Sequence, residues 1–433
     1  MRVLVVGGGG REHALCWRLA RDPSVDRLFA APGNAGIALE AECMPVASDD
    51  LEGLVALVER ERIDLTVVGP EAPLVAGLAD ELDARGHAVF GPSKAAARIE
   101  GSKAWAKWLM ERAGVPTARS ATFSRADWDH DARAVLAYLQ DELGGGPSVV
   151  KADGLAAGKG VIVADSTHEA AVAVEACLGR GAFGEAGRTV VIEERLSGPE
   201  VSAFALSDGR TVLPLDMAQD FKRVGDHDAG PNTGGMGAYT PVTFLDDTTA
   251  ELIRVEILER TFRAMADKGV PYRGLLYAGI MLTDDGPKTL EFNCRFGDPE
   301  TQVLMPRLAS SPSELFLACA RGDLGGAVEL RPEACVTVVL ASGGYPGAYE
   351  VGFEISGLAE AGAVEGVTVF HSGTAEVQGR VVTAGGRVLS VSAVGASLRE
   401  ARDRAYRGCA RVSFEGMHHR NDVAASAAEE ERS

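Results

Sequence analysis

The sequence lacks the features of membrane, secreted and redox-active proteins. No uninterrupted apolar run approaches the length of a membrane span, and no basic segment precedes an apolar run near Met1. The seven cysteines are scattered and odd in number, without the paired spacing of zinc ribbons or redox motifs. We therefore expect a soluble, cytoplasmic protein without a membrane partner, whose thiols are reduced and mostly buried.

Positive charge is also scarce, because 43 Lys and Arg residues stand against 62 Asp and Glu residues and leave a formal net charge of −19. Such a balance repels phosphate backbones and argues against a nucleic-acid surface unless the chain has a strong local basic patch. An anionic substrate must instead meet locally placed lysines, arginines and backbone N–H groups. We expect small-molecule partners, no nucleic acid, and a monomer or weak homo-oligomer.

The length of 433 residues fits roughly three domains of about 150 residues each. In the first hundred residues, short apolar runs alternate with helical patterns, which is the rhythm of a mostly parallel α/β sheet. The expected strands lie near residues 2–6, 27–30, 64–69 and 87–90, and the expected helices near 11–21, 51–60 and 74–85. Ligands bind such sheets at the carboxyl ends of strands, here the loops 7–12, 31–36 and 69–73.

The remaining chain predicts two further regions. A helix from Ser102 stops at Gly114 and Pro116, a glycine followed by a proline, which indicates a first domain boundary nearby. Residues 216–241 have almost no periodicity and predict a long functional loop, and residues 246–268 predict one helix. The expected fold is α/β and α+β, with an N-terminal parallel α/β domain (1–101), a central domain (102–330), a C-terminal α+β domain (331–423) and a frayed acidic tail (424–433).

A strand that runs into a glycine-rich loop extends from Val149 to Gly160 and carries Lys151 and Lys159. Glycines let backbone N–H groups approach phosphate oxygens, and the lysines supply cations. The loop is not a Walker A motif, because three residues intervene where that motif has four and Gly160 replaces its Ser or Thr. A plain hairpin turn would have no use for the two lysines, so the loop predicts a lid over a nucleoside triphosphate.

A second glycine-rich segment, from Gly7 to Glu12, follows a strand and opens a helix. A dinucleotide-binding loop is the obvious alternative, but the third glycine of that fingerprint falls at Glu12. The helix amino terminus can still bind a simple phosphate through its free N–H groups and dipole, with Arg11 nearby. The segment therefore favours phosphate binding over dinucleotide binding or a structural turn.

Alternation along the strand at residues 290–295 points Glu291, Asn293 and Arg295 to one face. Carboxylate and amide oxygens suit Mg²⁺, which typically bridges nucleotide phosphates. The alternative is a solvated polar face with no ligand. The apolar strand at residues 190–196 also ends in acids, and it predicts either an ordinary sheet edge or a backbone contact to adenine with Glu200 near the ribose hydroxyls.

Taken together, residues 149–160, 191–196 and 291–295 resemble the ATP-grasp superfamily of carboxylate–amine ligases. A narrower set of motifs is similar to the glycinamide ribonucleotide synthetase (phosphoribosylamine–glycine ligase) family of purine biosynthesis. These motifs cover almost the full length and lie at residues 9–15, 31–36, 68–74, 149–160, 230–239 and 291–301. The resemblance implies an amine-recognising domain, an ATP-grasp core with a mobile lid at about residues 120–195, and a C-terminal domain that closes the cleft.

The resemblance also implies a role for each matching residue. Those implied in catalysis are Arg295, Lys151 and Asp220. Those implied in ATP binding are Lys103, Lys107, Lys151, Asp153, Gly154, Gly158, Lys159, Gly160, Glu193, Glu194, Leu196 and Glu200. Those implied in binding phosphoribosylamine or glycine are Gly9, Gly10, Arg11, Glu12, Asn34, Glu71, Lys222, Arg223 and Gly234, and the implied metal ligands are Glu291 and Asn293.

The chemistry implied by the resemblance is the ATP-dependent joining of glycine to phosphoribosylamine through glycyl phosphate, with Mg²⁺ or Mn²⁺ as cofactor. A related ligase or carboxylase that uses bicarbonate or formate would share the ATP site. A non-enzymatic ATP-binding module is the third possibility, but it would have no use for Glu291, Asn293 and Arg295. Release of ADP that depends on one acid and one amine distinguishes these three functions.

Overall fold

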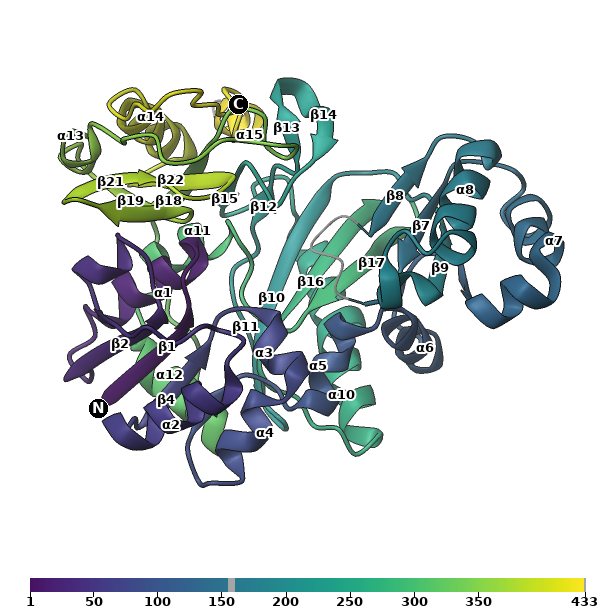
Figure 1. Cartoon of the computed structure of the whole chain (residues 1–433), viewed down its shortest axis with the longest axis horizontal. Coiled ribbons are helices and arrows are strands. Elements are labelled where there is room, and N and C mark those ends of the chain that lie inside the picture. Colours follow the sequence, from purple (N-terminus) through teal and green to yellow (C-terminus); the bar gives the residue numbers. More distant parts are fainter. Residues whose placement is uncertain (155–159, 432–433) are drawn as a thin grey trace.

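The computed structural model describes residues 1–154 and 160–431 (Figure 1). Its amino-terminal part is built on a parallel five-stranded sheet in the order β3-β2-β1-β4-β5, which confirms the predicted α/β fold. Every residue of the central strand after Arg2 is buried, because helices cover both faces of such a sheet. The strands are β1 (Arg2–Gly7), β2 (Arg27–Pro32), β3 (Glu42–Cys43), β4 (Leu65–Val68) and β5 (Val89–Phe90).

The helices of this domain follow the predicted pattern with two differences. The single helix predicted over residues 74–85 is wrong, because Gly77 adopts a φ of 107° that ends one helix and begins another. A helix just before Ser102 was not predicted from the sequence. The helices are α1 (Gly10–Leu19), η1 (Ile37–Leu39), α2 (Leu51–Glu61), α3 (Glu71–Ala76), α4 (Leu78–Asp83) and α5 (Lys94–Gly101).

Residues 120–154 and 160–194 form a small lobe at the right of Figure 1, around an antiparallel sheet in the order β6-β9-β7-β8. This small lobe has its own core, whose buried members all lie between Val135 and Ile192. It therefore shares no core cluster with the rest of the described chain. Its elements are β6 (Ser120–Ser124), α7 (Arg125–Asp141), β7 (Ser148–Ala152), β8 (Val161–Ala164), α8 (Thr167–Val174), η2 (Glu175–Gly179), η3 (Gly184–Arg188) and β9 (Thr189–Glu194).

The centre of the molecule is an antiparallel sheet in the order β11-β10-β16-β17. One hydrophobic core joins it to the amino-terminal domain, since Leu4 and Ile99 belong to the same cluster as Ala203 and Ile280. The predicted helix stop is confirmed, with Gly114 as a left-handed cap. The elements are α6 (Lys103–Ala113), β10 (Glu200–Asp208), β11 (Val212–Pro214), α9 (Asp247–Leu252), η5 (Ile253–Glu259), α10 (Arg260–Asp267), β16 (Arg273–Thr283), β17 (Gly286–Asn293), α11 (Thr301–Arg307) and α12 (Pro312–Arg321).

The helix predicted over residues 246–268 is present, but its middle segment η5 is π-helical. The carboxy-terminal region is α+β, as predicted, and its sheet has the order β12-β15-β18-β22-β19. Its elements are β18 (Ala334–Ala341), α13 (Leu358–Gly362), β19 (Val367–His371), β20 (Thr374–Val377), β21 (Arg380–Thr383), β22 (Arg387–Gly395), α14 (Leu398–Cys409) and α15 (Ala425–Glu430).

The segment 216–241, which its lack of periodicity predicts to be one long loop, contains short strands. It forms the strands β12 (Gln219–Asp220), β13 (Arg223–Gly225), β14 (Ala229–Asn232) and β15 (Gly237–Thr240), with the turn η4 (Asp226–Asp228). β15 pairs with β18, so two strands from the middle of the chain belong to the carboxy-terminal sheet. Strands this short are invisible to periodicity, because two to four residues cannot establish an alternation.

The predicted frayed tail is also wrong. Residues 425–430 form α15, in which Ala427 and Ala428 are buried against the carboxy-terminal core. The carboxylate of Glu431 accepts a 3.0 Å hydrogen bond from the backbone N–H of Leu398, at the start of α14. The acidic composition of this segment predicted a frayed tail, but the alanines between the acids form an apolar face that packs against the core.

The cysteines match the expectation, because all seven are free and only Cys43 is more than slightly exposed. Among the helices of residues 1–154 and 160–431, none combines the length and apolar character needed to cross a bilayer.

Candidate active site

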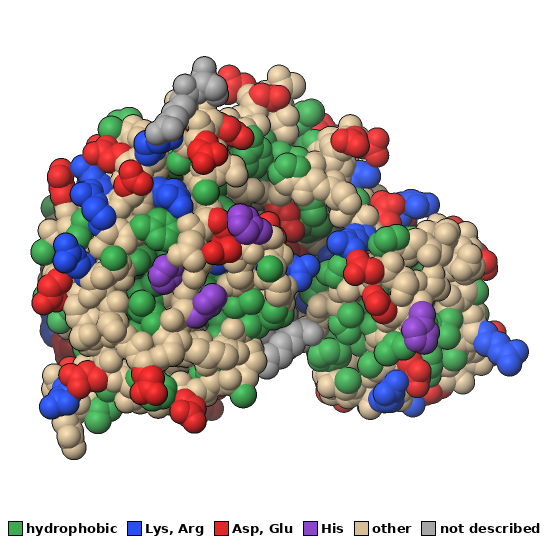
Figure 2. Space-filling view, turned by 90° about the horizontal axis from the view of Figure 1, so that it is seen from above, with side chains coloured by type: hydrophobic (Ala, Val, Ile, Leu, Met, Phe, Trp, Pro, Cys, Tyr) green, Lys and Arg blue, Asp and Glu red, His purple; other side chains and the backbone are tan. Residues whose placement is uncertain are grey.

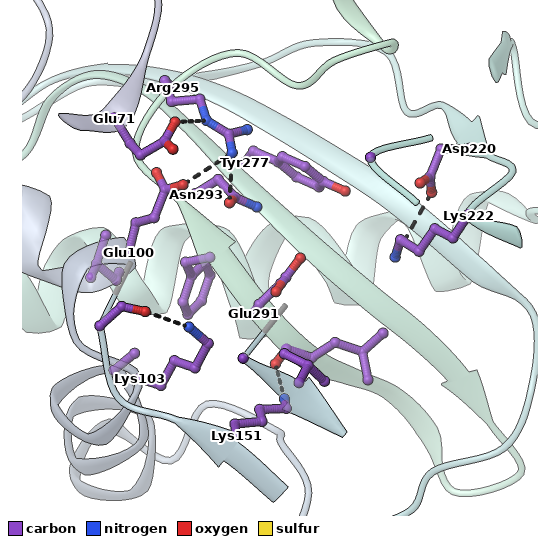
Figure 3. A pocket seen from close by; sticks show the side chains of 18 of the residues that line it. Glu71, Glu100, Lys103, Lys151, Asp220, Lys222, Tyr277, Glu291, Asn293 and Arg295 are labelled. Carbon is purple, nitrogen blue, oxygen red and sulfur yellow. Dashed lines mark hydrogen bonds and ion pairs between the residues drawn. The ribbon is translucent and has the colours of Figure 1, made fainter. Parts of the chain in front are cut away.

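A cavity of about 270 Å³ lies where the small lobe, the central sheet and the amino-terminal domain meet (Figure 3). The space-filling view shows the small lobe set apart from the rest of the molecule by a groove (Figure 2). The predicted site residues that line the cavity are Glu71, Lys103, Lys107, Lys151, Gly154, Gly160, Glu193, Asp220, Lys222, Gly234, Glu291, Asn293 and Arg295. Gly158 and Lys159 lie outside the described residues.

The strand β17 brings Glu291 and Asn293 into the cavity, and Arg295 follows just beyond its end. All three line the cavity, as alternation along the strand predicted. Burial alone would raise the pKa of Glu291, but the positive charges of Lys222, Lys151 and Lys103 hold that pKa below its usual value. Glu291 is therefore a carboxylate, and among the described residues no ion pair or hydrogen bond occupies its side chain.

Arg295 is held by three oxygen-bearing side chains at one end of the cavity. Its Nε lies 3.2 Å from Glu71 Oε2, and its Nη2 lies 3.0 Å from Glu100 Oε1 and 3.1 Å from Asn293 Oδ1. Burial would lower the pKa of Arg295, but Glu100 and Glu71 raise it above its usual value. The guanidinium is consequently a fixed cation that joins the amino-terminal domain to the acidic strand.

The lysines of the ATP-binding prediction gather around Glu193 of β9. Its two carboxylate oxygens lie 3.2 Å from Lys107 Nζ and 3.0 Å from Lys151 Nζ, and Lys151 also donates to the carbonyl of Leu290 at 2.9 Å. Burial lowers the pKa of Lys107 to about 8. The Glu193 carboxylate therefore balances these two lysines, and its backbone belongs to β9, which pairs with β6 and β7. Lys103 Nζ donates to the carbonyl of Gly154 at 3.1 Å.

The opposite end of the cavity is acidic. Lys222 Nζ makes a tight ion pair with Glu200 Oε2 and lies 3.9 Å from Asp220 Oδ1. Burial raises the pKa of Asp220 to about 7, against the lowering effect of Lys222 and with the help of Glu300. Glu200 itself does not line the cavity, so its carboxylate is used on Lys222 in this conformation.

Other predicted ATP-binding residues have structural partners outside the cavity. Asp153 accepts hydrogen bonds from Ser102 and from the backbone of Ala104 at the start of α6, so its carboxylate caps that helix. Glu194 points to the other face of β9, where it pairs with Arg119 at 2.9 Å. Leu196 lies in the segment after that strand, and it does not line the cavity.

Of the three amino-terminal loops, only the one at residues 69–73 lines the cavity, through Glu71, whereas the loops at residues 7–12 and 31–36 do not. Glu12 accepts from the backbone N–H of Gly9 at 2.6 Å and contacts Arg11 Nε at 2.5 Å. Gly10 sits so close to Ser372 and Gln302 that a Cβ would collide with both. The side-chain amide of Asn34 donates to the carbonyls of Gly8 and His371, while its oxygen accepts from Gly36 and Ile37. These residues thus join the amino-terminal loops to the carboxy-terminal domain.

The predicted substrate residues of the 216–241 segment separate in space. Gly234 lines the cavity, whereas Arg223 donates to the carbonyl of Gly230 at 2.7 Å within the exposed β13-β14 hairpin. Lys222, the residue before Arg223, lines the cavity. Arg223 therefore belongs to the β13-β14 hairpin and not to the site.

Several cavity residues escaped the sequence reasoning, namely Glu100, Tyr277, Asp298 and Glu300. Asp298 pairs with Arg387 of β22 at 3.0 Å, and Arg387 also donates to the carbonyl of Gly234 at 2.5 Å. The carboxy-terminal domain therefore reaches the rim of the site through Arg387 and through Tyr345, whose hydroxyl accepts a 3.0 Å hydrogen bond from the Gly234 N–H. The sequence did carry a signal for Asp298 and Glu300, since both stand in the charged turn that follows Arg295.

The donor set suits a divalent cation that is shared with a nucleotide. Among residues 1–154 and 160–431, no group of three or more His, Cys, Asp or Glu side chains is arranged to hold a metal ion alone. Glu291 offers a carboxylate that has no hydrogen-bond or ion-pair partner among the described residues, and Asn293 adds an amide oxygen that also accepts from Arg295 Nη2. One or two protein oxygens with phosphates and waters are the usual environment of Mg²⁺, so these residues fit it.

Comparisons with known proteins agree along the whole chain. Profiles of the phosphoribosylglycinamide synthetase family match in three parts: the N domain at residues 1–100, the ATP-grasp (A) domain at residues 101–301 and the C domain at residues 335–426. The phosphoribosylamine–glycine ligase of Nostoc sp. is 50% identical over 432 residues, which cover 98% of this chain and 99% of that protein.

Solved structures agree with this result. The crystal structure of phosphoribosylamine–glycine ligase from Thermotoga maritima is similar with a TM-score of 0.84 and 35% identity, covering 98% of this chain and 100% of that one. The biotin carboxylase domain of Hydrogenobacter thermophilus 2-oxoglutarate carboxylase, solved with MgADP, has a TM-score of 0.73 at 18% identity, covering 96% and 91%. That second likeness shows a shared fold alone. The chain belongs to the phosphoribosylglycinamide synthetase family.

Proposed function

We propose that this protein is an ATP-dependent ligase that joins glycine to 5-phosphoribosylamine in de novo purine biosynthesis. The products are glycinamide ribonucleotide, ADP and phosphate. The observation that carries the proposal is one cavity that holds Lys151 of the glycine loop, Glu291 and Arg295 of the acidic strand, and Glu71 of the amino-terminal domain. The full-length match to curated phosphoribosylamine–glycine ligases supports this choice of substrates.

The ATP site would occupy the side of the cavity next to the small lobe. Lys103, Lys107 and Lys151 would contact the phosphates, together with Lys159. The backbone from Glu193 to Leu196 would meet the adenine, and Glu200 the ribose once it separates from Lys222. Residues 120–195 would act as the lid, which fits a lobe whose core is independent of the rest.

Glu291 and Asn293 would hold Mg²⁺ or Mn²⁺, which would neutralise phosphate charge when bound. Glycine would enter between Arg295 and Asp220. The amino-terminal loops with Gly9, Gly10, Arg11, Glu12 and Asn34, and the carboxylate of Glu71, would surround phosphoribosylamine. The carboxy-terminal domain would close over it through the contacts of Arg387.

In the first step, a glycine carboxylate oxygen attacks the γ-phosphorus of ATP and ADP leaves. In the second, the amine nitrogen of phosphoribosylamine attacks the carbonyl carbon, phosphate leaves and the nitrogen loses a proton. Neither step needs a nucleophile from the protein. The lysines and Arg295 would align the reactants and stabilise the charge that spreads over the phosphoryl oxygens.

The test is ADP release by the full-length protein with ATP, Mg²⁺ and pairs of substrates. Glycine with freshly made phosphoribosylamine should trigger release, whereas bicarbonate or formate should not. Mass spectrometry of the product should give glycinamide ribonucleotide. Release with bicarbonate or formate would point to a related carboxylase or ligase, and tight ATP binding without release in any mixture would point to a binding module.

A further inference from the structure

Arg420 is a buried cation that does not line the cavity. Its side chain is 1% exposed, and it stands in the segment 418–422 near the carboxy terminus. Its Nε and Nη2 each lie 2.7 Å from an oxygen of Asp422, and its Nη1 lies 2.7 Å from Asp228 Oδ1. Nη1 also donates to the carbonyl of Arg223 at 3.2 Å. A guanidinium with several partners fixes their directions as well as their distances, because its donors form a rigid planar fork.

One of these partners, Asp228, lies in the turn of the β13-β14 hairpin, which stands beside α15 in Figure 1. This turn holds His227 and Asp228 at φ values of 55° and 54°, a left-handed conformation that is costly for most residues other than glycine. Arg420 binds the Asp228 carboxylate, and Asp422 accepts a 2.8 Å hydrogen bond from the backbone N–H of His227. The segment 418–422 therefore stabilises the conformation of this turn.

The guanidinium of Arg420 also lies over a side chain next to the cavity. Its Cζ is 4.8 Å from the centroid of the Phe221 ring, and Phe221 packs against the carboxy-terminal core. Phe221 stands between Asp220 and Lys222, which both line the cavity (Figure 3). Alternation along the chain thus turns one side chain toward Arg420 and its two neighbours toward the cavity.

Backbone hydrogen bonds keep the residues around Phe221 in this register. The Phe221 N–H donates to the carbonyl of Gly237 at 2.9 Å, and the Phe221 carbonyl accepts from the Met236 N–H at 2.7 Å. The Lys222 carbonyl accepts from the Thr233 N–H at 2.7 Å. Such N–H groups exchange with solvent when the segment opens, so their exchange rates report how firmly it is held.

We propose that Arg420 is a positioning residue for the reaction. Through Phe221 and the β13-β14 hairpin, it fixes the segment that brings Asp220 and Lys222 to the cavity. This inference rests on the proposed function, and it gives the segment 418–422 a role in turnover without contact to a substrate.

The alternative is that Arg420 only anchors the carboxy-terminal tail. That tail has a second anchor, because Arg402 of α14 donates to the carbonyls of Val423 at 3.0 Å and Asn421 at 2.7 Å. Arg402 also lies over an aromatic ring, with its Cζ 4.7 Å from the centroid of Tyr406. Within the described part of the chain, no hydrogen bond or ion pair joins Arg402 to the β13-β14 hairpin. Arg402 is therefore a matched control for Arg420.

The test compares hydrogen–deuterium exchange of the full-length wild-type, Arg420→Met and Arg402→Met proteins, read by mass spectrometry in peptides that cover residues 219–237. We expect exchange in these peptides to be about tenfold faster or more in Arg420→Met, because a buried ion-pair network is lost. In Arg402→Met the exchange should stay within about twofold of wild type. Unchanged exchange in Arg420→Met, or an equal increase in Arg402→Met, overturns the positioning role.

Turnover shows whether a loosened segment impairs the reaction. We expect kcat for ADP release to fall about tenfold in Arg420→Met, because misplaced side chains lose catalysis steeply, and to stay within about twofold of wild type in Arg402→Met. Combining Arg420→Met with Lys222→Met should cost less than the two single losses predict together, since Arg420 acts partly through Lys222. Additive losses overturn the positioning role.

Asp228→Asn decides the question if Arg420→Met does not fold. The Asp228 side chain is 72% exposed, and asparagine tolerates a left-handed backbone, so this variant should fold. It loses the charge that Arg420 binds, and exchange in the same peptides should rise by about twofold to threefold. Unchanged exchange in Asp228→Asn then overturns the positioning role.

The outcomes separate this proposal from the proposed function, because the exchange measurement needs no turnover. Faster exchange in Arg420→Met with a normal rate of ADP release overturns the positioning role and leaves the ligase. Faster exchange in Arg420→Met, together with no ADP release by the wild-type protein in any substrate mixture, overturns the ligase and retains the link between Arg420 and the cavity.

Discussion

The two ends of the cavity differ in how many partners their charged side chains have. At one end, Arg295 contacts Glu71, Glu100 and Asn293, and Glu100 also accepts a 2.7 Å hydrogen bond from the backbone of Cys294. At the other end, Asp220 has one cation at 3.9 Å and no hydrogen-bond donor among the described residues. We call the first the arginine end and the second the acidic end.

This difference indicates which end already has its final geometry before a ligand binds. A saturated network keeps its geometry without help, which is what electrostatic stabilisation of a transition state requires. An unsaturated network is costly alone and gains when a ligand supplies the missing charge. We therefore interpret the arginine end as preorganised for catalysis and the acidic end as built for binding.

The largest expected effect on turnover comes from removing the cation at the arginine end. We expect Arg295→Ala to lower turnover by about a hundredfold or more, because one preorganised electrostatic contact is lost and the carboxylates of Glu71 and the buried Glu100 lose their ion-pair partner. Arg295→Lys, which keeps a charge but not the planar fork, should fall between this variant and wild type. Steady-state ADP release at saturating substrates measures both. Near-normal turnover of Arg295→Ala would remove Arg295 from the mechanism.

The Glu291 carboxylate, between the two ends, should determine the magnesium concentration that activity requires. Glu291→Ala should raise the magnesium concentration for half-maximal activity by at least about tenfold, because an ionised oxygen ligand disappears. The measurement is ADP release titrated with Mg²⁺ at fixed ATP. An unchanged titration would contradict the assignment of Glu291 as a ligand.

A smaller effect is expected from a variant that removes one ion pair of the arginine end but keeps Arg295 itself. Glu100→Gln keeps an acceptor for the Cys294 N–H but loses the ion pair to Arg295, so we expect kcat to fall about fivefold to tenfold with the KM for ATP unchanged. Glu111→Gln, on the exposed side of α6, is the matched control.

The double variant tests whether Glu100 acts through Arg295. Glu100→Gln combined with Arg295→Ala should be no slower than Arg295→Ala alone, because a residue that positions another has no effect once that residue is gone. Additive losses would mean that Glu100 contributes independently of Arg295.

The smallest expected effect is on stability, and it concerns the contact between His13 and His371, two buried histidines that are neutral in the folded protein. His371 of β19 donates its backbone N–H to His13 Nδ1 at 2.7 Å, joining the carboxy-terminal and amino-terminal domains. Burial lowers the pKa of His13 from 6.5 to about 3 and that of His371 to about 4. The unfolded chain therefore binds more protons below about pH 6.5, and stability should fall as the pH drops, by up to about 1.4 kcal/mol per pH unit for each histidine.

The measurement is urea unfolding at pH 6.5 and pH 5. His13→Asn places its Oδ1 where Nδ1 lies, which keeps an acceptor for the His371 N–H, and it cannot titrate, so its loss of stability between these pH values should be smaller than that of wild type. An equal loss in both proteins would show that another group controls the acid sensitivity.

Much of this site was predictable because its signals are local. The alternation that carries Glu291, Asn293 and Arg295 into the cavity needs a few consecutive residues of one strand. The glycine that ends α6 and the serine that begins α14 likewise act within one turn of their helices. The break at Gly77 and the alanine face of α15 are also local signals, although neither was predicted.

Other features depend on partners distant in the sequence. Glu100 belongs to the site because it meets the backbone of a residue 194 positions later. Arg387 reaches Asp298 and Gly234 from a strand of another domain. Asp153 and Glu194 stand within predicted motifs, yet their carboxylates are used by α6 and by Arg119. No pattern along the chain announces such pairings.

The sequence by itself determined the parallel amino-terminal sheet, the helix stop at Gly114 and the acidic strand, since each follows from backbone geometry over a few residues. Only the tertiary structure decided which carboxylates find a cation and which are left without one. The physical reason is that the energy of a charge depends on its burial and on the groups that folding brings within a few ångströms, and these come from every part of the chain.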